Sequence, residues 1–274
     1  MNEPKPPRPD AEALLAQASQ WWSTAIIDVR PNVIRPRGLP IQDLIGRVSF
    51  PQMIWLMLQG ALPSQEQAVL LEAALVAAVD HGPQAPSIAI SRMAVSCGLP
   101  LNGAMASAIN ALDDVHGGAG EQCLALYQSA QRRLGAQSLS DAVGAALDDF
   151  VQQNGKIVPG FGHRFHSIDP RSVRLMELVR LAREVGTVSG TYADIGSAIE
   201  TELARRTGRT LPMNIDGATA VIYGELGFEP PLARGLFILS RSVGILAHAW
   251  EESNQGRRIK GPMPPAIPYR YTGP

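Results

Sequence analysis

The fold is indicated first by residues 63–83, which read PSQEQAVLLEAALVAAVDHGP. Ser64, followed three residues later by Gln67, forms the capping box that typically opens a helix. Leucine and alanine then recur at helical spacing as far as Gly82-Pro83, a pair that ends such a pattern. The stretch therefore predicts a helix that begins at Ser64 and stops before Gly82.

Similar alanine- and leucine-rich stretches recur along the chain, whereas the alternating runs typical of strands are scarce. The pattern predicts further helices at 103–112, 121–134, 140–153, 170–184, 192–207, 215–226 and 231–252. Glycine and proline lie in the gaps between these segments. No repeat of fixed period is present, so the sequence favours a non-repetitive, all-α fold.

The composition is that of an ordinary globular protein. The 274 residues are 45% hydrophobic and 18% charged, and a formal net charge of -1 offers no general attraction for nucleic acid. The only cysteines, Cys97 and Cys123, have no CxxC spacing. We therefore predict neither a disulfide framework nor a structural zinc site.

Targeting and membrane signals are weak in this sequence. Residues 1–10 are polar and rich in proline, which is typical of a disordered lead and not of a signal peptide. The most apolar later stretch, residues 235–250, is interrupted by Arg241 and His248, which favours a buried helix over a membrane span. We expect a soluble, cytoplasmic protein that binds neither nucleic acid nor membranes.

Polar side chains gather in short segments at predicted helix ends and glycine-rich turns, where they can reach a ligand. These segments are Asp80-His81-Gly82, Val115-His116-Gly117-Gly118, Pro159-Gly160-Phe161-Gly162-His163-Arg164, Asn214-Ile215-Asp216-Gly217 and Ser240-Arg241. In the third segment, two glycines that flank an aromatic residue can direct backbone groups at a ligand. In the last, a guanidinium among apolar residues needs a partner, either a structural carboxylate or a bound one.

Each segment also has a plain structural interpretation. His163 can be an exposed residue of a turn between helices, and His116 can follow a helix C-cap. Asp216 can be an N-cap, the commonest role of an aspartate at a helix start. His248 is typical of a hydrogen-bonded core histidine, and Asp169-Pro170-Arg171 of a helix start with proline at the first position. Taken one at a time, the segments leave both interpretations open.

Taken in order, these segments resemble the citrate synthase superfamily from about residue 26 to residue 273. The shared pattern comprises Arg37-Gly38, Ser49-Phe50, Leu62-Pro63, His116-Gly117-Gly118-Ala119, residues 159–163, Asp169-Pro170-Arg171, Asn214-Ile215-Asp216, Ser240-Arg241, Ala247-His248 and Tyr271-Thr272-Gly273. Within the superfamily the chain is most similar to short citryl-CoA lyases and to the lyase module of ATP-citrate lyase. That similarity lies in Gly162-His163-Arg164 and in residues 211–218 and 237–244.

The resemblance implies a citrate synthase-like, all-α enzyme that cleaves or forms the carbon–carbon bond between acetyl-CoA and oxaloacetate or a related oxo acid. It implies three catalytic residues: Asp216 for proton transfer at the acetyl methyl group, His116 for the thioester oxygen and His163 for the oxo-acid oxygen. It further implies that the substrate carboxylates are bound by His81, Arg171 and Arg241, and coenzyme A by Val158, Pro159, Gly160, Phe161, Gly162 and Arg164.

The same resemblance implies a two-domain organisation and an oligomer. A large helical domain, residues 11–117 and 227–274, and a small one, residues 118–226, would close over a cleft that holds the active site. A homodimer or larger homo-oligomer would complete that site. The coenzyme A thioester is a substrate, and we expect no tightly bound cofactor and no metal.

Two departures from full-length citrate synthases keep other functions open. The N-terminal portion is shorter, and Lys260-Gly261-Pro262 stands where synthases commonly carry an arginine before the proline. The main alternative is a citrate or methylcitrate synthase, which hydrolyses the thioester. A metal-dependent hydrolase with His81, His116, His163 and Asp216 as ligands is a second alternative, although no HExxH-type spacing supports it. A non-catalytic helical interaction protein is a third.

Overall fold

The computed structural model describes residues 10–163, 166–264 and 266–274. The predicted disordered lead, residues 1–10, lies outside these ranges except for Asp10, which caps the first helix by accepting a hydrogen bond from the Ala13 N–H at 2.7 Å. The chain divides into two compact units, Met1–Ala68 and Val69–Pro274. This division differs from the predicted large and small domains, which stay a prediction.

The first unit combines short helices with a small hairpin. Its elements are α1 (Ala11–Trp21), β1 (Ile27–Arg30), β2 (Val33–Pro36), α2 (Ile41–Leu44), α3 (Phe50–Gln59) and the first residues of α4 (Gln65–Ala78). The two strands are antiparallel and pair Ile27 with Pro36 and Arg30 with Val33. Neither this hairpin nor the helices before α4 were predicted from the sequence.

The capping box predicted at the start of α4 is present. The Ser64 hydroxyl accepts the Gln67 N–H at 3.2 Å, and the Gln67 side chain accepts the Ser64 N–H at 2.9 Å. A second capping box, formed by Ser49 and Gln52, opens α3. Local side-chain hydrogen bonds therefore fix where both helices begin.

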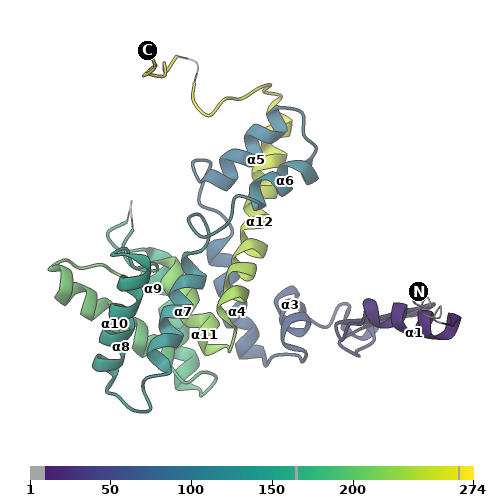
Figure 1. The fold of residues 1–274 in the computed structure, drawn as a ribbon, viewed down its shortest axis with the longest axis horizontal. Helices are drawn as coiled ribbons and strands as arrows, with labels where there is room; N and C mark the ends of the chain where they lie inside the picture. The colour runs from purple at the N-terminus through teal and green to yellow at the C-terminus, as the bar shows by residue number, and fades with distance from the viewer. Residues whose placement is uncertain (1–9, 164–165, 265) are drawn as a thin grey trace, which may run out of the picture. The chain divides into compact units, whose positions relative to one another are not determined.

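The second unit is a helical assembly that contains the rest of α4 (Figure 1). Its further helices are α5 (Pro86–Ser96), α6 (Leu101–Ile109), α7 (Ala119–Gln131), α8 (Leu139–Asn154), α9 (Pro170–Glu184), α10 (Thr191–Thr207), α11 (Ile215–Glu225) and α12 (Pro230–Gln255). Every helix predicted from the sequence is present with ends shifted by a few residues, and α5 is an addition. The predicted all-α fold class is confirmed.

Two helices organise the core of this unit. The long helix α12 packs against α5, α6 and α7, and α11 packs against α7, α9 and α10. Residues 217–224 of α11 are buried without interruption, which places the start of α11 next to the interior. Both helices carry residues of the candidate site, Asp216 at the start of α11 and Arg241 near the middle of α12.

Among the residues that the structure describes, α12 is the one helix with the length and composition of a membrane span. A core helix of a soluble protein passes the same test. Leu236 and Ile245 of α12 are fully buried, and so is the charged Glu252 at 1% exposure. Packing against α5, α6 and α7 buries one side of this helix, whereas Leu239, Val243, Leu246 and Trp250 are exposed.

Candidate active site

The turn that carries His163 is held against the chain just before α11. The Gly162 N–H donates to the Pro212 carbonyl at 2.8 Å, and the Asn214 N–H donates to the Gly160 carbonyl at 2.9 Å. The Asn214 side chain adds a bond from Nδ2 to the Gly162 carbonyl at 2.7 Å. These three bonds fix the position of the turn relative to the start of α11, where Asp216 lies.

Gly160 allows this close approach of two backbone segments. Its φ is +86°, and an added Cβ would lie 2.5 Å from the Cys123 sulfur and 3.0 Å from the Gly217 Cα. No larger side chain fits without moving one of these neighbours. The glycine predicted as a ligand-binding backbone residue is thus also required for packing the turn onto α7 and α11.

Asp216 is not the N-cap of its helix, so the structural interpretation of this residue was wrong. The cap is Asn214, whose Oδ1 accepts the N–H groups of Asp216 at 2.9 Å and Gly217 at 3.3 Å. Among the described residues, none donates a hydrogen bond to the Asp216 carboxylate. Burial raises the pKa of Asp216, Arg171 and Arg241 act to lower it, and Asp169 acts to raise it. A carboxylate with a raised pKa and no internal partner is suited to proton transfer.

Asp169 joins α9 to the start of α11. The residue is 2% exposed. Its carboxylate accepts three hydrogen bonds from Arg171, from the backbone N–H at 3.0 Å, from Nε at 3.0 Å and from Nη2 at 2.8 Å. It also accepts the Ile215 N–H at 3.1 Å. Burial alone would raise the pKa of Asp169, but the bonds from Arg171 and Ile215 hold it below its ordinary value. The predicted helix start at Asp169 is confirmed, and the link to α11 was missed.

This arrangement bears directly on the predicted role of Arg171. Its Nε and Nη2 are engaged by Asp169, while Nη1 has no hydrogen-bond partner among the described residues. The guanidinium can therefore present one edge to a substrate carboxylate while Asp169 fixes its orientation. Binding of a substrate by Arg171 stays a prediction.

His163 and His81 lie next to each other. Their ring centroids are 5.7 Å apart and the rings meet edge to face at 80°. The His166 N–H donates to Nδ1 of His163 at 3.1 Å, so a neutral His163 carries its proton on Nε2. Burial lowers the pKa of His163, and burial followed by the charges of Arg171 and Arg241 lowers the pKa of His81. Both rings are therefore favoured in the neutral form near pH 7.

His116 lies in the loop between α6 and α7 and is held by the start of α5. The Ser87 N–H donates to Nε2 of His116 at 3.1 Å, and the Ser87 hydroxyl lies 3.0 Å from the same nitrogen. Because Nε2 accepts a backbone hydrogen bond, a neutral His116 carries its proton on Nδ1. Burial and the charge of Arg241 lower the pKa of His116. The role of Ser87 was not predicted from the sequence.

Arg241 connects these residues electrostatically. The residue is 5% exposed, its Nε donates to the Ala78 carbonyl at 3.0 Å, and its guanidinium lies 4.8 Å from the Phe237 ring centre. Burial lowers the pKa of Arg241, which Asp80 and Asp216 act to raise. No carboxylate of the described residues lies at ion-pair distance from Arg241, so the structural ion pair considered for this residue is not formed. Its charge acts on His81, His116 and Asp216, so the structure brings these groups into one region.

The segment predicted to bind coenzyme A is largely buried. Val158 and Phe161 are 7% and 9% exposed, and the Phe161 ring packs edge-on against Tyr127 at 6.4 Å. Gly160 and Gly162 already use backbone groups in bonds to Pro212 and Asn214. The groups left for a ligand are those of Val158, Pro159 and Phe161. The remaining predicted residue, Arg164, lies outside the described residues.

His248 is a hydrogen-bonded histidine, as predicted, and not part of the site. Its Nδ1 lies 3.0 Å from Nη1 of Arg92, and its Nε2 lies 3.4 Å from Asp80 Oδ2. Within the described ranges, no three His, Cys, Asp or Glu side chains are grouped to hold a metal ion. The four residues proposed as metal ligands are therefore not arranged as a ligand set.

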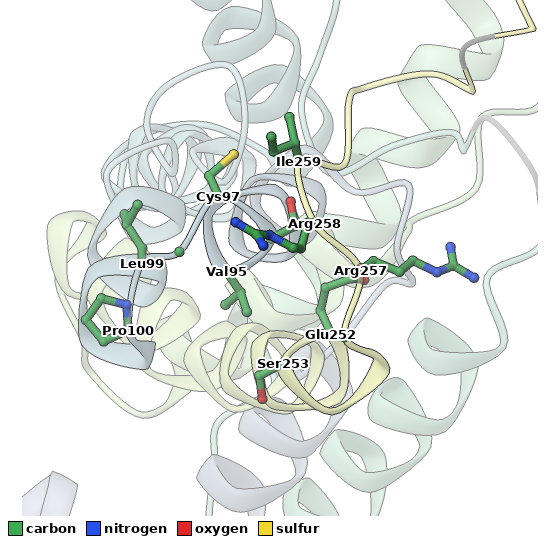
Figure 2. A pocket seen from close by; sticks show the side chains of 12 residues that line it. Val95, Cys97, Leu99, Pro100, Glu252, Ser253, Arg257, Arg258 and Ile259 are labelled. Atoms are coloured by element: carbon green, nitrogen blue, oxygen red, sulfur yellow. The ribbon is translucent and has the colours of Figure 1, made fainter.

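One hollow in the described part of the chain lies away from these residues. It has a volume of about 550 Å³ and lies between residues 95–100 and 252–259. Figure 2 shows Cys97 and Arg258 at this hollow. None of the predicted site residues lines it. The candidate site is therefore defined by its polar contacts and not by this cavity.

Comparison with known proteins identifies the family. The model of the "Citrate synthase, C-terminal domain" matches residues 66–262. The solved citryl-CoA lyase from Hydrogenobacter thermophilus is 32% identical, with a TM-score of 0.81 over 92% of this chain and 95% of that one. ATP citrate lyase from Methanothrix soehngenii, at 20% identity and a TM-score of 0.76, shares the fold over 100% of this chain and 46% of its own.

A curated relative adds a comparison of length. A citrate synthase from Heyndrickxia coagulans is 29% identical over 222 residues, which are 80% of this chain and 55% of that enzyme. The chain thus spans about half the length of this relative. The predicted resemblance is confirmed in both fold and sequence. The family match over most of the chain, joined to the all-helical fold, shows that this protein belongs to the citrate synthase family.

Proposed function

We propose that the chain is a citryl-CoA lyase-like enzyme that cleaves, or in reverse forms, the carbon–carbon bond between acetyl-CoA and oxaloacetate or a related oxo acid. One observation carries this proposal. The Asp216 carboxylate has a raised pKa and no hydrogen-bond partner among the described residues. The charge of Arg241 acts on this carboxylate and also on His81 and His116, whose pKa values are lowered. The reaction proceeds through an enol or enolate.

In the synthetic direction, Asp216 removes a proton from the methyl group of the acetyl thioester. The electron pair left on carbon delocalises onto the thioester oxygen, which must be stabilised. His116 suits this task because its proton lies on Nδ1, while Ser87 occupies Nε2. A neutral imidazole donates this hydrogen bond without transferring a full charge, and the lowered pKa of His116 maintains that form.

The enol then attacks the carbonyl carbon of the oxo acid, and a protonated His163 gives its Nε2 proton to the carbonyl oxygen, which becomes a hydroxyl, so that His163 returns to the neutral form. In cleavage, neutral His163 holds its proton on Nδ1 after the His166 N–H contact has opened, and its Nε2 accepts the proton of the tertiary hydroxyl of citryl-CoA as the carbon–carbon bond breaks. Asp216 returns a proton to the methylene carbon of the departing enol. The contact of His163 with His81 and the anchoring of its turn to α11 support this placement.

Arg241, Arg171 and His81 are proposed to bind the carboxylates of the oxo acid. Arg241 is buried and uses Nε for Ala78, so its two terminal nitrogens can form a fork for one carboxylate. Arg171 offers Nη1. Both guanidinium groups stay charged at any working pH. Coenzyme A is proposed to contact the backbone of residues 158–161, with Arg164 near it.

Two observations support the lyase proposal over the alternative. The lyase from Hydrogenobacter thermophilus matches this chain along 95% of its own length, whereas the citrate synthase relative matches along 55%. Gly261 also stands where synthases commonly carry a carboxylate-binding arginine. The sequence likeness to citrate synthases supports a citrate or methylcitrate synthase as the second candidate.

Supplied citryl-CoA tests the proposal. A lyase converts it to acetyl-CoA and oxaloacetate without release of free thiol, and oxaloacetate is measured by its reduction with malate dehydrogenase. A synthase instead releases coenzyme A thiol from citryl-CoA, or from acetyl-CoA with an oxo acid. Absence of either product with the folded wild-type chain would favour the non-catalytic interpretation and refute both enzymatic ones.

The two-domain closure and the homodimer are part of the proposal. Residues 118–226 are proposed to close on residues 11–117 and 227–274 when both substrates bind, which excludes water from the enol. Light scattering during size-exclusion chromatography measures the assembly, and a monomer with full turnover would refute the dimer requirement.

A further inference from the structure

One arginine of α12 contacts three carboxylates around the loop that carries His116. Arg234 pairs through Nη1 with Asp113, through Nη2 with Asp114 and through Nε with Glu121. Asp113 and Asp114 precede His116 in the loop, and Glu121 lies in the first turn of α7 that follows it. A single guanidinium thus holds both ends of the loop at residues 113–118.

Apart from the bonds of His116 to Ser87, few other hydrogen bonds between described residues fix the position of the loop. The Asp113 N–H donates to the His116 carbonyl at 2.9 Å, and Gln122 Nε2 donates to the Asp114 carbonyl at 3.1 Å. Val115 is fully exposed at 102%. Apolar packing therefore does not anchor the tip of the loop, and its placement depends on polar contacts.

The loop is also tightly folded on itself, so a displacement at one end moves the other. A Cβ added to Gly118 would lie 2.7 Å from the Asp114 backbone, and Gly117 has a φ of +109°. A small movement of the Asp114 end is thus transmitted to His116. At the other side, the hydrogen bonds of the described residues hold the His116 ring at Nε2, through Ser87.

We propose that Arg234 is a positioning residue that sets the direction of the His116 Nδ1–H by clamping the loop at residues 113–118 to α7 and α12. The effect on turnover rests on the function proposed above, whereas the effect on the His116 ring does not. Without the guanidinium, three carboxylates face one another and repel. The loop then relaxes outward, because two of those carboxylates, Asp113 and Asp114, already have highly exposed side chains at 79% and 73%.

Ordinary stabilisation by surface ion pairs is the competing explanation. Exposed pairs contribute about 0–1 kcal/mol and need not affect a neighbouring ring. Arg206 provides a matched comparison, because it pairs with Asp148 and Glu202 between α8 and α10 with a side-chain exposure of 27%, against 21% for Arg234. Its charge is not among those that perturb the pKa values of the site histidines.

The first measurement needs no substrate. NMR titration of the histidine rings in the wild-type chain, Arg234→Gln, Arg234→Lys and Arg206→Gln follows His116, with its signals assigned by loss in His116→Gln. In Arg234→Gln we expect the His116 titration to move upward toward its ordinary value, because the ring leaves its buried place near Arg241. Arg234→Lys keeps the charge but cannot reach three carboxylates, so it should shift in the same direction.

The outcomes are distinct. Arg206→Gln should leave the His116 titration unchanged. A wild-type titration in Arg234→Lys would overturn the inference, because a shift confined to Arg234→Gln would report lost charge alone. Circular dichroism identifies any variant that fails to fold, and the other Arg234 variant then decides.

Turnover provides the second measurement. Arg234→Gln should lower kcat roughly 10- to 100-fold with KM for the oxo acid within about twofold, since misplaced catalytic groups cost that much while the carboxylate contacts remain. Arg206→Gln should keep wild-type kcat. A shifted titration with unchanged kcat would overturn the catalytic part of the inference. A wild-type chain without turnover would refute the proposed function, and the titration would still decide the role of Arg234.

Discussion

Replacing Asn214 with alanine tests whether one amide side chain joins the two catalytic segments. Asn214 Oδ1 accepts two N–H groups at the start of α11, and Nδ2 donates to the Gly162 carbonyl at 2.7 Å. Loss of an N-cap costs about 1 kcal/mol, and loss of one further hydrogen bond costs about 1 kcal/mol. The variant should therefore lose about 2 kcal/mol of unfolding free energy.

This loss is measurable by thermal and chemical unfolding. At about 2.1 cal/mol/K per residue, a chain of 274 residues has an unfolding entropy near 0.6 kcal/mol/K, so Tm should fall by roughly 3 °C. Turnover should fall at least about tenfold, because the turn of His163 and the start of α11 no longer hold each other in place.

Two further variants separate the contributions. Ser138 caps α8 by accepting the Asp141 N–H at 3.2 Å, and its hydroxyl donates to the Asp141 carboxylate at 2.7 Å, so Ser138→Ala should lose about 1 kcal/mol and keep its turnover. Asn214→Asp keeps the cap but loses the Nδ2 donor, and should retain stability better than Asn214→Ala while still losing turnover. If Asn214→Ala matched Ser138→Ala in both stability and turnover, the link between the segments would be refuted.

Three more predictions concern charge and packing. Asp216→Asn should abolish most turnover yet raise the unfolding free energy at pH 7 by about 1.4 kcal/mol per unit of raised pKa. The pKa of Asp216 is raised in the folded chain, so the contribution of Asp216 to stability is present in acid and is lost as the pH rises through that pKa. The gain in unfolding free energy of Asp216→Asn should therefore vanish below about pH 4. A gain that persists there would contradict the assignment. The pKa values of His81, His116 and His163 are lowered in the folded chain, so their contribution to the unfolding free energy should be complete above about pH 6.5 and decrease as the pH drops below it. The decrease should be smaller in His116→Gln. Urea titrations that give the same pH dependence for both chains would refute this. Gly160→Ala should lower the unfolding free energy by at least about 2 kcal/mol, since the added methyl group meets the Cys123 sulfur. Gly186 has a φ of +76° and open space around it, so Gly186→Ala should lower the unfolding free energy by only about 1 kcal/mol. Equal losses in the two variants would show that the close approach at Gly160 is unimportant.

Some of the missed elements lack the local signals by which others were predicted, whereas α3 was missed although Ser49 and Gln52 form a capping box. Ser64 opens α4 with a capping box that needs only the sequence between residues 64 and 67. In α5, the buried positions include Ser87, Ser91, Arg92 and Ser96, so burial does not follow hydrophobicity. Helix α1 has no buried residue, and hydrophobic periodicity has no core to report there. The hairpin is only two short strands joined at Pro31-Asn32, too brief for an alternating pattern to stand out.

The candidate site divides in the same way. His116, His163 and Asp216 belong to short segments with glycine or an amide beside them, so the sequence singled them out. Ser87 was missed because a serine at the start of a helix ordinarily suggests nothing beyond the helix. Its contact with His116 joins residues 29 positions apart and exists only once α5 packs beside the loop. The links made by Asp169 and Arg234 were missed for the same reason.

Local sequence patterns predicted α4 and the helices from α6 onward, where several of these begin, and which polar residues are available for chemistry. These properties depend on neighbours within a few positions along the chain. The folded structure was needed to show which nitrogen of His116 and of His163 carries the proton, that the Asp216 carboxylate has no hydrogen-bond partner among the described residues, and which arginine charges act on it. Those properties depend on burial and on distances between distant segments, and a buried charge takes its pKa from surroundings that exist only in the folded chain.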